Sequence, residues 1–505
     1  MPDSGSAFTS LDWVVLVLYL VGTTVLGVRL GRGQKNARDY FVADGTIPWW
    51  AVLFSVVATE TSALTFISIP GLAYLGDLGF LQVATGYLLG RVVVAYTLLP
   101  RYAEGELVTA YALLERRFGL ATRRFASVTF MVTRAFGDSV RLFATSIPVA
   151  LILSGIFAPR LAAPLAILVL GIATVIYTYH GGMRAVVWTD VLQMGVYLLG
   201  GLGALWLIGA GVDGGWGEIL SRAGEAGKLK MLDFHTGFDR PHTVFAGLLG
   251  GGFLAMASHG ADQIIVQRLL ASGSLRDARR ALIGSGVIVI AQFALFLLIG
   301  IGLWAFYDAQ AFPAPDRIFP AFIIAEMPPV MTGVVIAAIL AAAMSTVSGS
   351  LNALAASTLH DLYAPLRGAP EGAEGLRLSR VFTLLWAVVL VGGALLYRAE
   401  GTPVVVIALS IASFTYGGLL GGFFLAMLWP RATQRDAVTG MAVGIFVMSI
   451  VVFAGRLVAA FPQLAGPLAP VTGIAWPWFV LIGTAVTLTV GIVSSYTHAA
   501  PRSAP

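Results

Sequence analysis

The stretch ILAAAMSTVSGSLNALAASTLHDLY, from Ile339 to Tyr363, is long enough to cross a bilayer, yet it is rich in hydroxyl groups. Hydrocarbon cannot solvate a hydroxyl, so each of these groups needs a partner. At about 3.6 residues per turn, the Ala342 carbonyl lies beside the hydroxyls of Ser345 and Thr346, as in a small site for a hard cation. The alternative is that the hydroxyls bond back to carbonyls three or four residues earlier and bind nothing else.

Composition places the whole chain in the membrane. Its 505 residues are 58% hydrophobic and only 11% charged, and the mean hydropathy is +0.86, values far from those of soluble proteins. The absence of cysteine excludes disulfides, thiolate metal sites and cysteine nucleophiles. In a membrane protein, the formal charge of +5 reflects loops that face lipid headgroups, so we expect the bilayer as a partner and no nucleic acid.

Runs of about twenty apolar residues predict an all-α integral membrane protein with about 13 transmembrane helices. The spans begin near positions 12, 49, 79, 126, 161, 184, 243, 281, 330, 379, 403, 437 and 473. The first segment lacks the basic start of a cleavable signal, so we expect it to be retained.

The basic residues predict the orientation of the chain in the membrane. With the N-terminus outside, twenty Lys and Arg fall in inside segments and eight in outside segments. Four of the eight outside residues lie in one long loop. The other three, Arg91, Arg134 and Arg141, lie within spans. This asymmetry favours an outside N-terminus and a cytoplasmic C-terminus, in a multi-pass protein of the cell (inner or plasma) membrane.

The second span, AVLFSVVATETSALTFISIPG, is a candidate broken helix. Hydroxyl and β-branched residues between Ala58 and Thr65 interrupt its apolar run, and Pro70 with Gly71 closes it. If the helix unwinds near Ala58 to Ser62, the freed carbonyls need partners, and a bound cation together with a solute is one solution.

Glu60 is the costliest residue of this span and must be paired, protonated or hydrated. Candidate partners are Arg134 and Arg141 of the fourth span, which share one helical face with Asp138. These charges either form a structural cluster between helices, or Arg141 or Glu60 meets a charged end of a solute, since an arginine fork suits a carboxylate.

Two later stretches carry further polar residues inside spans. In TYHGGMRAVVWTDVLQ, a tight turn at Gly181 and Gly182 leads into the sixth span, where Asp190 is either a helix-end residue or a relay for cations leaving inward. The seventh span, GLLGGGFLAMASHGADQIIVQR, is the second candidate broken helix. Its His259 is either a packing residue or a proton carrier.

The two interrupted spans lie five spans apart, and an odd number of spans inverts the second copy relative to the first. This spacing predicts two inverted repeats of five helices with a binding site at the midplane. The predicted units are residues 1–47 (first helix and basic inner loop), 48–210 (first repeat), 211–241 (extracytoplasmic loop), 242–431 (second repeat) and 432–505 (two peripheral helices and tail).

Four motifs resemble those of the sodium:solute symporter family, which includes sodium/glucose, sodium/proline and sodium/iodide transporters. They are RDYFVADGTIPWWAVLFSVVAT, GGMRAVVWTDVLQ, ADQIIVQRLLA and AAAMSTVSGSLNALAASTLHDLY, in family order between residues 38 and 363. The resemblance implies the leucine-transporter-like fold of 5+5 inverted repeats and a secondary active transporter that moves Na⁺ with a solute.

The resemblance also implies a sodium site. Its ligands are the carbonyls of Ala58, Thr61 and Ala342 and the hydroxyls of Ser345 and Thr346. Five oxygens without a carboxylate suit a monovalent ion.

Some family members bind a second sodium, or pass sodium inward, at positions that match Asp190 and Ser348. Gly349 replaces a hydroxyl there, which disfavours a second ion.

The sugar-binding pattern of the glucose branch is not reproduced. Leu64 and Thr65 stand where that branch has a polar and acidic pair. We therefore expect a small polar solute, an amino acid or a carboxylate. The candidate substrate-binding residues are Glu60, Ser62, Thr65, Arg141, Ser258 and His259.

Four alternatives stay open at this point. Coupling to protons through Glu60 or His259, or transport of a sugar, would use the same fold. A solute sensor would need a signalling module, and we expect none in the ten or so residues after the last span. An enzyme is not expected, because the chain has no HExxH, GxSxG or nucleotide-binding motif. No oligomer is implied.

Overall fold

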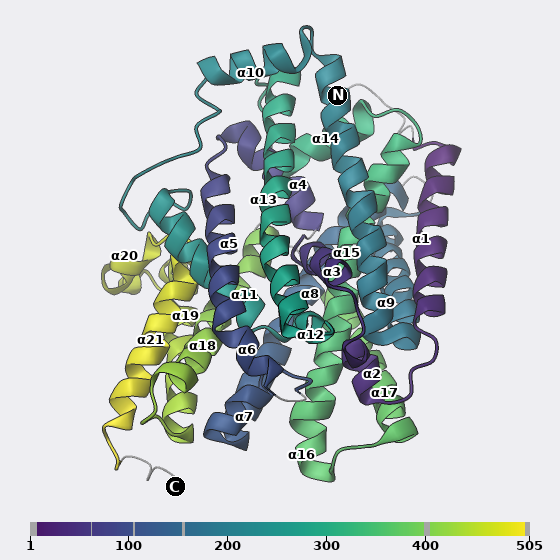
Figure 1. Ribbon diagram of the computed structural model, residues 1–505. Coiled ribbons are helices and arrows are strands. Elements are labelled where there is room, and N and C mark those ends of the chain that lie inside the picture. Colours follow the sequence, from purple (N-terminus) through teal and green to yellow (C-terminus); the bar gives the residue numbers. More distant parts are fainter. Residues whose placement is uncertain (1–7, 62, 105–106, 154–156, 398–403, 500–505) are drawn as a thin grey trace.

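The computed structural model describes residues 8–61, 63–104, 107–153, 157–397 and 404–499, and the regular elements in these ranges are helices (Figure 1). The first half contains α1 (Ser10–Leu30), α2 (Ala37–Val42), η1 (Ala43–Gly45), α3 (Trp49–Glu60), α4 (Ala63–Leu75), α5 (Phe80–Tyr96), α6 (Leu98–Ala103), α7 (Ala112–Phe118), α8 (Leu120–Leu153), α9 (Pro159–Gly211) and α10 (Gly215–Glu225).

The second half begins with η2 (Ala246–Gly251), α11 (Gly252–Gly260), α12 (Gln263–Leu270), α13 (Leu275–Phe306), η3 (Pro315–Arg317), α14 (Ile318–Ala325), α15 (Met331–Ser357), η4 (Thr358–Tyr363) and α16 (Ala364–Arg367). It ends with α17 (Gly372–Leu396), α18 (Val404–Leu428), α19 (Gln434–Ala460), η5 (Pro462–Leu464), α20 (Ala465–Thr472) and α21 (Trp478–Ser495). In Figure 1, α1 starts toward the upper end of the bundle, at its right edge, and α21 ends at the lower left.

The predicted all-α class is confirmed. Among the described residues, eight helices are long and apolar enough to cross a membrane, or nine if the bent pair α3 and α4 counts as one span. A helix or a broken helix lies at each of the thirteen predicted segments, but the count of thirteen crossings, the inverted repeats and the orientation stay predictions.

The predicted turn at Gly181 and Gly182 divides α9 into two halves. Gly182 has φ 52° and ψ −147°, a conformation that favours glycine. A methyl group on Gly27 of α1 would touch both Tyr177, at 2.6 Å, and Thr189, at 3.1 Å. Those two residues are twelve positions apart, about 18 Å in a straight helix, so the chain folds back at Gly182 and both halves pack against α1.

Helix α15, which contains most of the hydroxyl-rich stretch, is the centre of the bundle. Every residue from Val335 to Ser357 is buried, and α15 packs against α1, α3, α8, α9 and α17. A helix that is buried on all sides cannot use lipid or water to satisfy its polar groups. Its hydroxyls must therefore find partners within the protein or bind an ion or solute.

Helix α5 approaches the segment formed by η2 and α11 closely through two glycines. An added methyl group would lie 1.9 Å from the Gly247 carbonyl oxygen if it were on Gly86, and 2.2 Å from the Gly252 carbonyl oxygen if it were on Gly90. The GxxxG spacing of these residues thus marks backbone contact between α5 and the η2–α11 segment.

We predict that Gly86→Ala destabilises the fold by about 1 to 3 kcal/mol, because the methyl group overlaps a backbone oxygen that cannot move independently. Gly392→Ala in α17 is the matched control, since a methyl group there meets no atom within 4 Å. The measurement is the apparent unfolding temperature in detergent. Equal temperatures for the two variants would contradict the close contact.

Candidate functional site

The first interruption lies where the sequence predicts it. Helix α3 ends at Glu60, Thr61 is extended (φ −79°, ψ 97°), and the chain resumes as α4 with a bend of 63°. A helix end leaves carbonyl groups without intrahelical partners. Carbonyl oxygens near Ala58 and Thr61 are therefore the groups that a cation would find at this break. Ser62, also predicted to bind substrate, lies outside the described residues.

Four of the five predicted sodium ligands line one small cavity. Its volume is about 10 Å³, on the order of the space that one water-sized particle needs. The predicted ligands in its wall are Ala58, Thr61, Ala342 and Ser345, and the other wall residues are Gln193, Met194, Tyr197 and Ala341. The cavity lies where the end of α3 meets α9 and α15.

The oxygens around this cavity fit a monovalent cation. The Ser345 hydroxyl is fully buried and has no hydrogen-bond partner among the described residues. The Thr346 hydroxyl donates to the Ala342 carbonyl at 3.1 Å, so the back-bonded alternative holds for Thr346 but not for Ser345. A donating hydroxyl keeps its lone pairs. Ser345 and Thr346 can thus both present oxygens to a cation, and no carboxylate lines the small cavity.

The second interruption comes between α11 and α12. The glycines Gly250 and Gly251 close a π-helical turn, whereas the break itself falls at Ala261 and Asp262, where the backbone turns extended. The Asp262 side chain accepts a hydrogen bond from the Ile264 amide at 2.9 Å and caps α12. The predicted break in this span is therefore present. It lies about ten residues after the three glycines at 250 to 252, among the polar residues that follow them.

A larger cavity of about 330 Å³ lies beside the sodium ligands. Five of the six predicted substrate-binding residues line it: Glu60, Thr65, Arg141, Ser258 and His259. Thr346 lines it as well, so one predicted sodium ligand faces the cavity in which a solute would bind. Apolar side chains form much of the remaining wall, including Leu72, Phe80, Tyr87, Leu254, Phe293 and Trp476.

Glu60 does not pair with Arg134 or Arg141, so the predicted partners were wrong. It forms an ion pair with Arg91 of α5, whose side chain is fully buried, and the His259 Nε2 atom lies 3.7 Å from the same carboxylate oxygen. Arg91 was recognisable as a charge inside a span, but nothing in the sequence ties it to Glu60. Burying an arginine without a partner is costly, and this cost explains why Arg91 and Glu60 pair.

The Arg134, Asp138 and Arg141 side chains point into the bundle, as their spacing predicts. Arg134 pairs with Asp262 and bonds Tyr416 at 3.0 Å. Asp138 accepts from Ser350 at 2.5 Å and from Arg141 at 3.2 Å. The Arg141 side chain is 22% exposed and Asp138 is its ion-pair partner. Part of the Arg141 side chain is therefore accessible from the cavity that it lines.

His259 presents one ring nitrogen to the cavity. Its Nδ1 atom lies 2.8 Å from the Ser258 hydroxyl and 3.2 Å from the Ala255 carbonyl. Its Nε2 atom is buried and has no hydrogen-bond partner among the described residues. An unpartnered polar atom in a cavity wall is where a polar group of a solute would bind.

Asp190 and Ser348 both lie beside the predicted sodium ligand Ser345. Ser348 donates to the Ser345 carbonyl at 3.1 Å. Asp190 is fully buried, and its Oδ2 atom accepts from Ser55 at 2.5 Å and from Arg268 at 3.1 Å. Asp190 is therefore a member of a buried ion pair rather than a helix-end residue.

Arg268 is misplaced by the sequence. It is one of the twenty basic residues that the sequence assigns to inside segments, but its side chain is fully buried. Helix α12 is only eight residues long and carries polar groups, so its sequence resembles that of a loop. In the structure it packs against α3 and α15. Without Arg268, nineteen inside cations still outnumber the eight outside.

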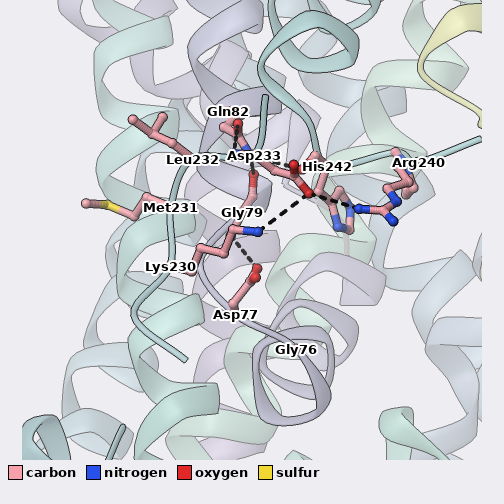
Figure 2. A pocket seen from close by; sticks show the side chains of 11 residues that line it. Gly76, Asp77, Gly79, Gln82, Lys230, Met231, Leu232, Asp233, Arg240 and His242 are labelled. Carbon is pink, nitrogen blue, oxygen red and sulfur yellow. Dashed lines mark hydrogen bonds and ion pairs between the residues drawn. The ribbon is translucent and has the colours of Figure 1, made fainter. Parts of the chain in front are cut away.

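Two further cavities lie between the central cavity and the loop that follows α10, and each shares lining residues with the next. A cavity of about 460 Å³ lies next to the central cavity, and a third of about 290 Å³ lies under Lys230 to Asp233 and Arg240 to His242 (Figure 2). His242 lines all three cavities. Burial lowers the pKa of His242 from its ordinary value, which favours a neutral imidazole at this neck at neutral pH.

The wall of the outer cavity is held in place by the protein itself. Figure 2 shows Lys230 and Arg240 approaching the Asp233 carboxylate from opposite sides, each at 3.7 Å. Gln82 of α5 donates to the His242 carbonyl at 3.0 Å and accepts from the Asp233 amide at 3.0 Å. The loop is thus fastened to α5 at His242, the residue that the three cavities share.

Comparison with known proteins agrees with this architecture. The sodium/sialic acid symporter NanT of Aliivibrio fischeri is 30% identical over 449 residues, which are 87% of each chain. The sodium-coupled monocarboxylate transporter 1 of Xenopus laevis is 27% identical over 477 residues, 92% of this chain and 75% of that protein. A solved structure of a substrate-bound, outward-open Na⁺-coupled sialic acid symporter superimposes with a TM-score of 0.85 at 26% identity, covering 98% of this chain and 99% of that one.

The family comparison extends over most of the molecule. A model of the sodium:solute symporter family matches residues 40–444, from α2 into α19. That range contains both helix interruptions, α15 and every residue assigned above to the sodium site, and of the residues named above in the wall of the central cavity it omits Trp476. The chain belongs to the sodium:solute symporter family.

Proposed function

We propose that this protein couples the inward movement of sodium to the uptake of a small organic solute that carries a carboxylate. Sodium as the coupling ion follows from the family, whereas the solute and the residues that bind it are our proposal. The observation that supports it most is the position of Thr346, which lines the solute cavity and bonds the predicted sodium ligand Ala342. Each ligand could thus stabilise the binding of the other.

Arg141 is our candidate for the carboxylate-binding residue. It lines the central cavity, is partly exposed there, and is held from one side by Asp138. A guanidinium fixed in this way can still offer its other N–H groups to a planar anion. The relatives NanT and monocarboxylate transporter 1 are named for acids, which agrees with a carboxylate as the recognised group.

The other cavity residues would position the rest of the solute. His259 Nε2 and the Ser258 hydroxyl are placed to bind a polar substituent, and the aromatic and aliphatic wall suits an apolar body. Glu60 is already neutralised by Arg91. We therefore propose that Glu60 shapes the cavity. Because Arg91 compensates its negative charge, the solute needs no cationic group to pair with it. An acid without an amino group is thus favoured over an amino acid.

The transport cycle would follow from the two broken helices. In our proposal, residues 48–210 and 242–431 are the two inverted repeats, and sodium joins α3 to α15 in the state that is open to the loop after α10. With the N-terminus outside, this loop is external, and the path past His242 admits the solute. Loss of sodium toward Asp190 and the inside would release α3 from α15 and open the opposite face.

The first test is uptake into proteoliposomes of labelled monocarboxylates, amino acids and sugars, with and without an inward sodium gradient. We predict sodium-driven accumulation of at least one carboxylate and none of the sugars. Accumulation driven by a proton gradient but not by sodium would contradict the proposal and would direct attention to Glu60 and His259.

Ser345→Ala tests the sodium site. Loss of one hydroxyl ligand is predicted to raise the sodium concentration for half-maximal uptake by about tenfold or more. Ser379→Ala is the matched control, because that buried hydroxyl of α17 donates only to the Gly375 carbonyl at 2.7 Å. Unchanged sodium dependence in Ser345→Ala, with the solute still transported, would show that the ion binds elsewhere.

Arg141→Gln tests the carboxylate site. Removing a charge-assisted hydrogen bond is predicted to raise the KM for the solute by about 10- to 150-fold, whereas Arg141→Lys should recover part of the affinity. Sodium binding without solute should stay near normal in both variants. A KM that is insensitive to Arg141→Gln would exclude this residue from solute binding.

A further inference from the structure

The wall of the central cavity changes from polar to apolar with distance from the two helix breaks. On α4, which starts just after the first break, Thr65 lines the cavity first, and Ile69 and Leu72 follow at helical spacing. On α11, which ends at the second break, Leu254 lies one turn farther from the break than Ser258. The cavity therefore has a polar end beside the breaks and an apolar end away from them.

The proposed carboxylate-binding residue faces the polar end. Arg134 of α8 pairs with Asp262, which lies at the second break. Arg141 follows about two turns later, but its guanidinium reaches back one turn to pair with Asp138. This direction is the usual one, since long side chains on a helix point toward its N-terminus. A carboxylate bound to Arg141 would thus leave the apolar end of the cavity to the rest of the solute.

Trp476 is a wall residue of the central cavity, although it belongs to the last part of the chain. It lies in the turn between α20 and α21, beyond the range that the family model matches. Trp476 is half-buried and packs against the hydrophobic core, so one part of it is held by the protein while another part faces the cavity. An indole in such a wall offers a large and rigid apolar surface to a ligand.

Three contacts fix the turn between α20 and α21 against the rest of the protein. The Ala475 amide donates to the Phe238 carbonyl at 2.7 Å, and the Trp478 ring packs against the Phe238 ring with 4.9 Å between their centroids. A methyl group on Gly250 of η2 would lie 2.6 Å from the Pro477 carbonyl oxygen. The turn is therefore held between the loop after α10 and the start of the second broken helix.

The second broken helix also measures how far this turn lies from the polar end. Gly250 of η2 and Leu254 and Ser258 of α11 are spaced by four residues, so they follow one helical face. Eight residues span about 12 Å at a rise of about 1.5 Å per residue. The turn that carries Trp476 packs on Gly250, whereas Ser258 lines the polar end. A short acid bound at the polar end leaves this distance unfilled, and an acid with an extended apolar body reaches Trp476.

We propose that Trp476 is a specificity-determining residue that binds the apolar body of an elongated monocarboxylate, in which several bonds separate an aromatic or aliphatic group from the carboxylate. The inference rests on the proposed function, since it requires an acidic solute anchored at Arg141. It makes the turn between α20 and α21 a part of the solute site, although the two helices lie outside the predicted repeats.

The test is a length series of acids that share one ring. Benzoate, phenylacetate, phenylpropionate and phenylbutyrate are titrated into the purified full-length protein by calorimetry, in sodium and in potassium. The sodium-dependent part of the binding is the signal, because detergent takes up apolar acids in both salts. We expect Trp476→Ala to raise the Kd of phenylbutyrate by about tenfold or more and that of benzoate by less than about twofold. Trp476→Phe keeps an aromatic ring and should recover part of the affinity.

Two variants serve as matched controls. Trp206→Ala removes a tryptophan of α9 that is 68% exposed and lines neither the central cavity nor the sodium cavity. Trp478→Leu disturbs the same turn as Trp476→Ala, but Trp478 is buried and does not line the central cavity. Both should leave the ratio of the Kd values for phenylbutyrate and benzoate unchanged, and Trp478→Leu should lower the unfolding temperature. A ratio changed equally by Trp478→Leu and Trp476→Ala would trace the effect to a loosened turn and overturn the inference.

The outcomes separate this inference from the proposed function. Sodium-dependent binding of the acids with the same Kd ratio in the wild type and in Trp476→Ala overturns the role of Trp476 and leaves the proposed function standing. An improved affinity of Trp476→Ala for phenylbutyrate overturns it as well. If neither the series nor the short acids acetate and lactate bind in a sodium-dependent way, the proposed function fails and the inference with it. If Trp476→Ala does not fold, Trp476→Leu, with its smaller apolar side chain, decides by the same ratio.

Discussion

A polar or charged group inside a helix bundle in lipid is stable only when another group binds it, and this constraint decides what surrounds α15. The helix is buried along its whole inner length, so its hydroxyls need partners within the protein or an ion. Ser350 binds Asp138 of α8, and Ser348 binds the carbonyl of Ser345 in the same helix. The hydroxyls of Ser345 and Ser357 have no hydrogen-bond partner among the described residues, and Ser345 lines a cavity of about 10 Å³ at the end of α3.

The same constraint explains why the two helix interruptions come together. A break in a helix frees backbone groups that lipid cannot satisfy, so broken helices are found where they line a cavity. Here the ends of α3 and α11 meet around the central cavity, and the extended residues Thr61 and Asp262 carry their own partners, Gln292 and the Ile264 amide. The charges follow the same rule, since Glu60, Asp138, Asp190 and Asp262 each lie against an arginine.

The sequence predicted the features that local sequence determines, namely helices, helix breaks and tight turns. Hydropathy located the helices, the hydroxyls located the first break, and the glycine pair located the fold-back at Gly182. The predicted end of the second span at Pro70 and Gly71 was wrong, because Pro70 lies inside α4, which continues to Leu75. Spatial pairing could not be predicted, because the acid that binds an arginine is chosen by tertiary packing. Glu60 was therefore assigned to the wrong arginines. Arg268 was placed in a loop because α12 is too short and too polar to look like a membrane helix, although packing against α3 and α15 buries it completely.

The central claim is that sodium between α3 and α15 and a solute in the central cavity stabilise each other through Thr346, which lines that cavity. The most direct measurement is the linkage between the two ligands in the purified protein, by titrating solute at low and high sodium and sodium at low and high solute. The account predicts that sodium lowers the Kd of the solute, that the solute lowers the Kd of sodium by the same factor, and that Ser345→Ala reduces that factor. A solute that binds with the same Kd in sodium and in potassium would contradict it.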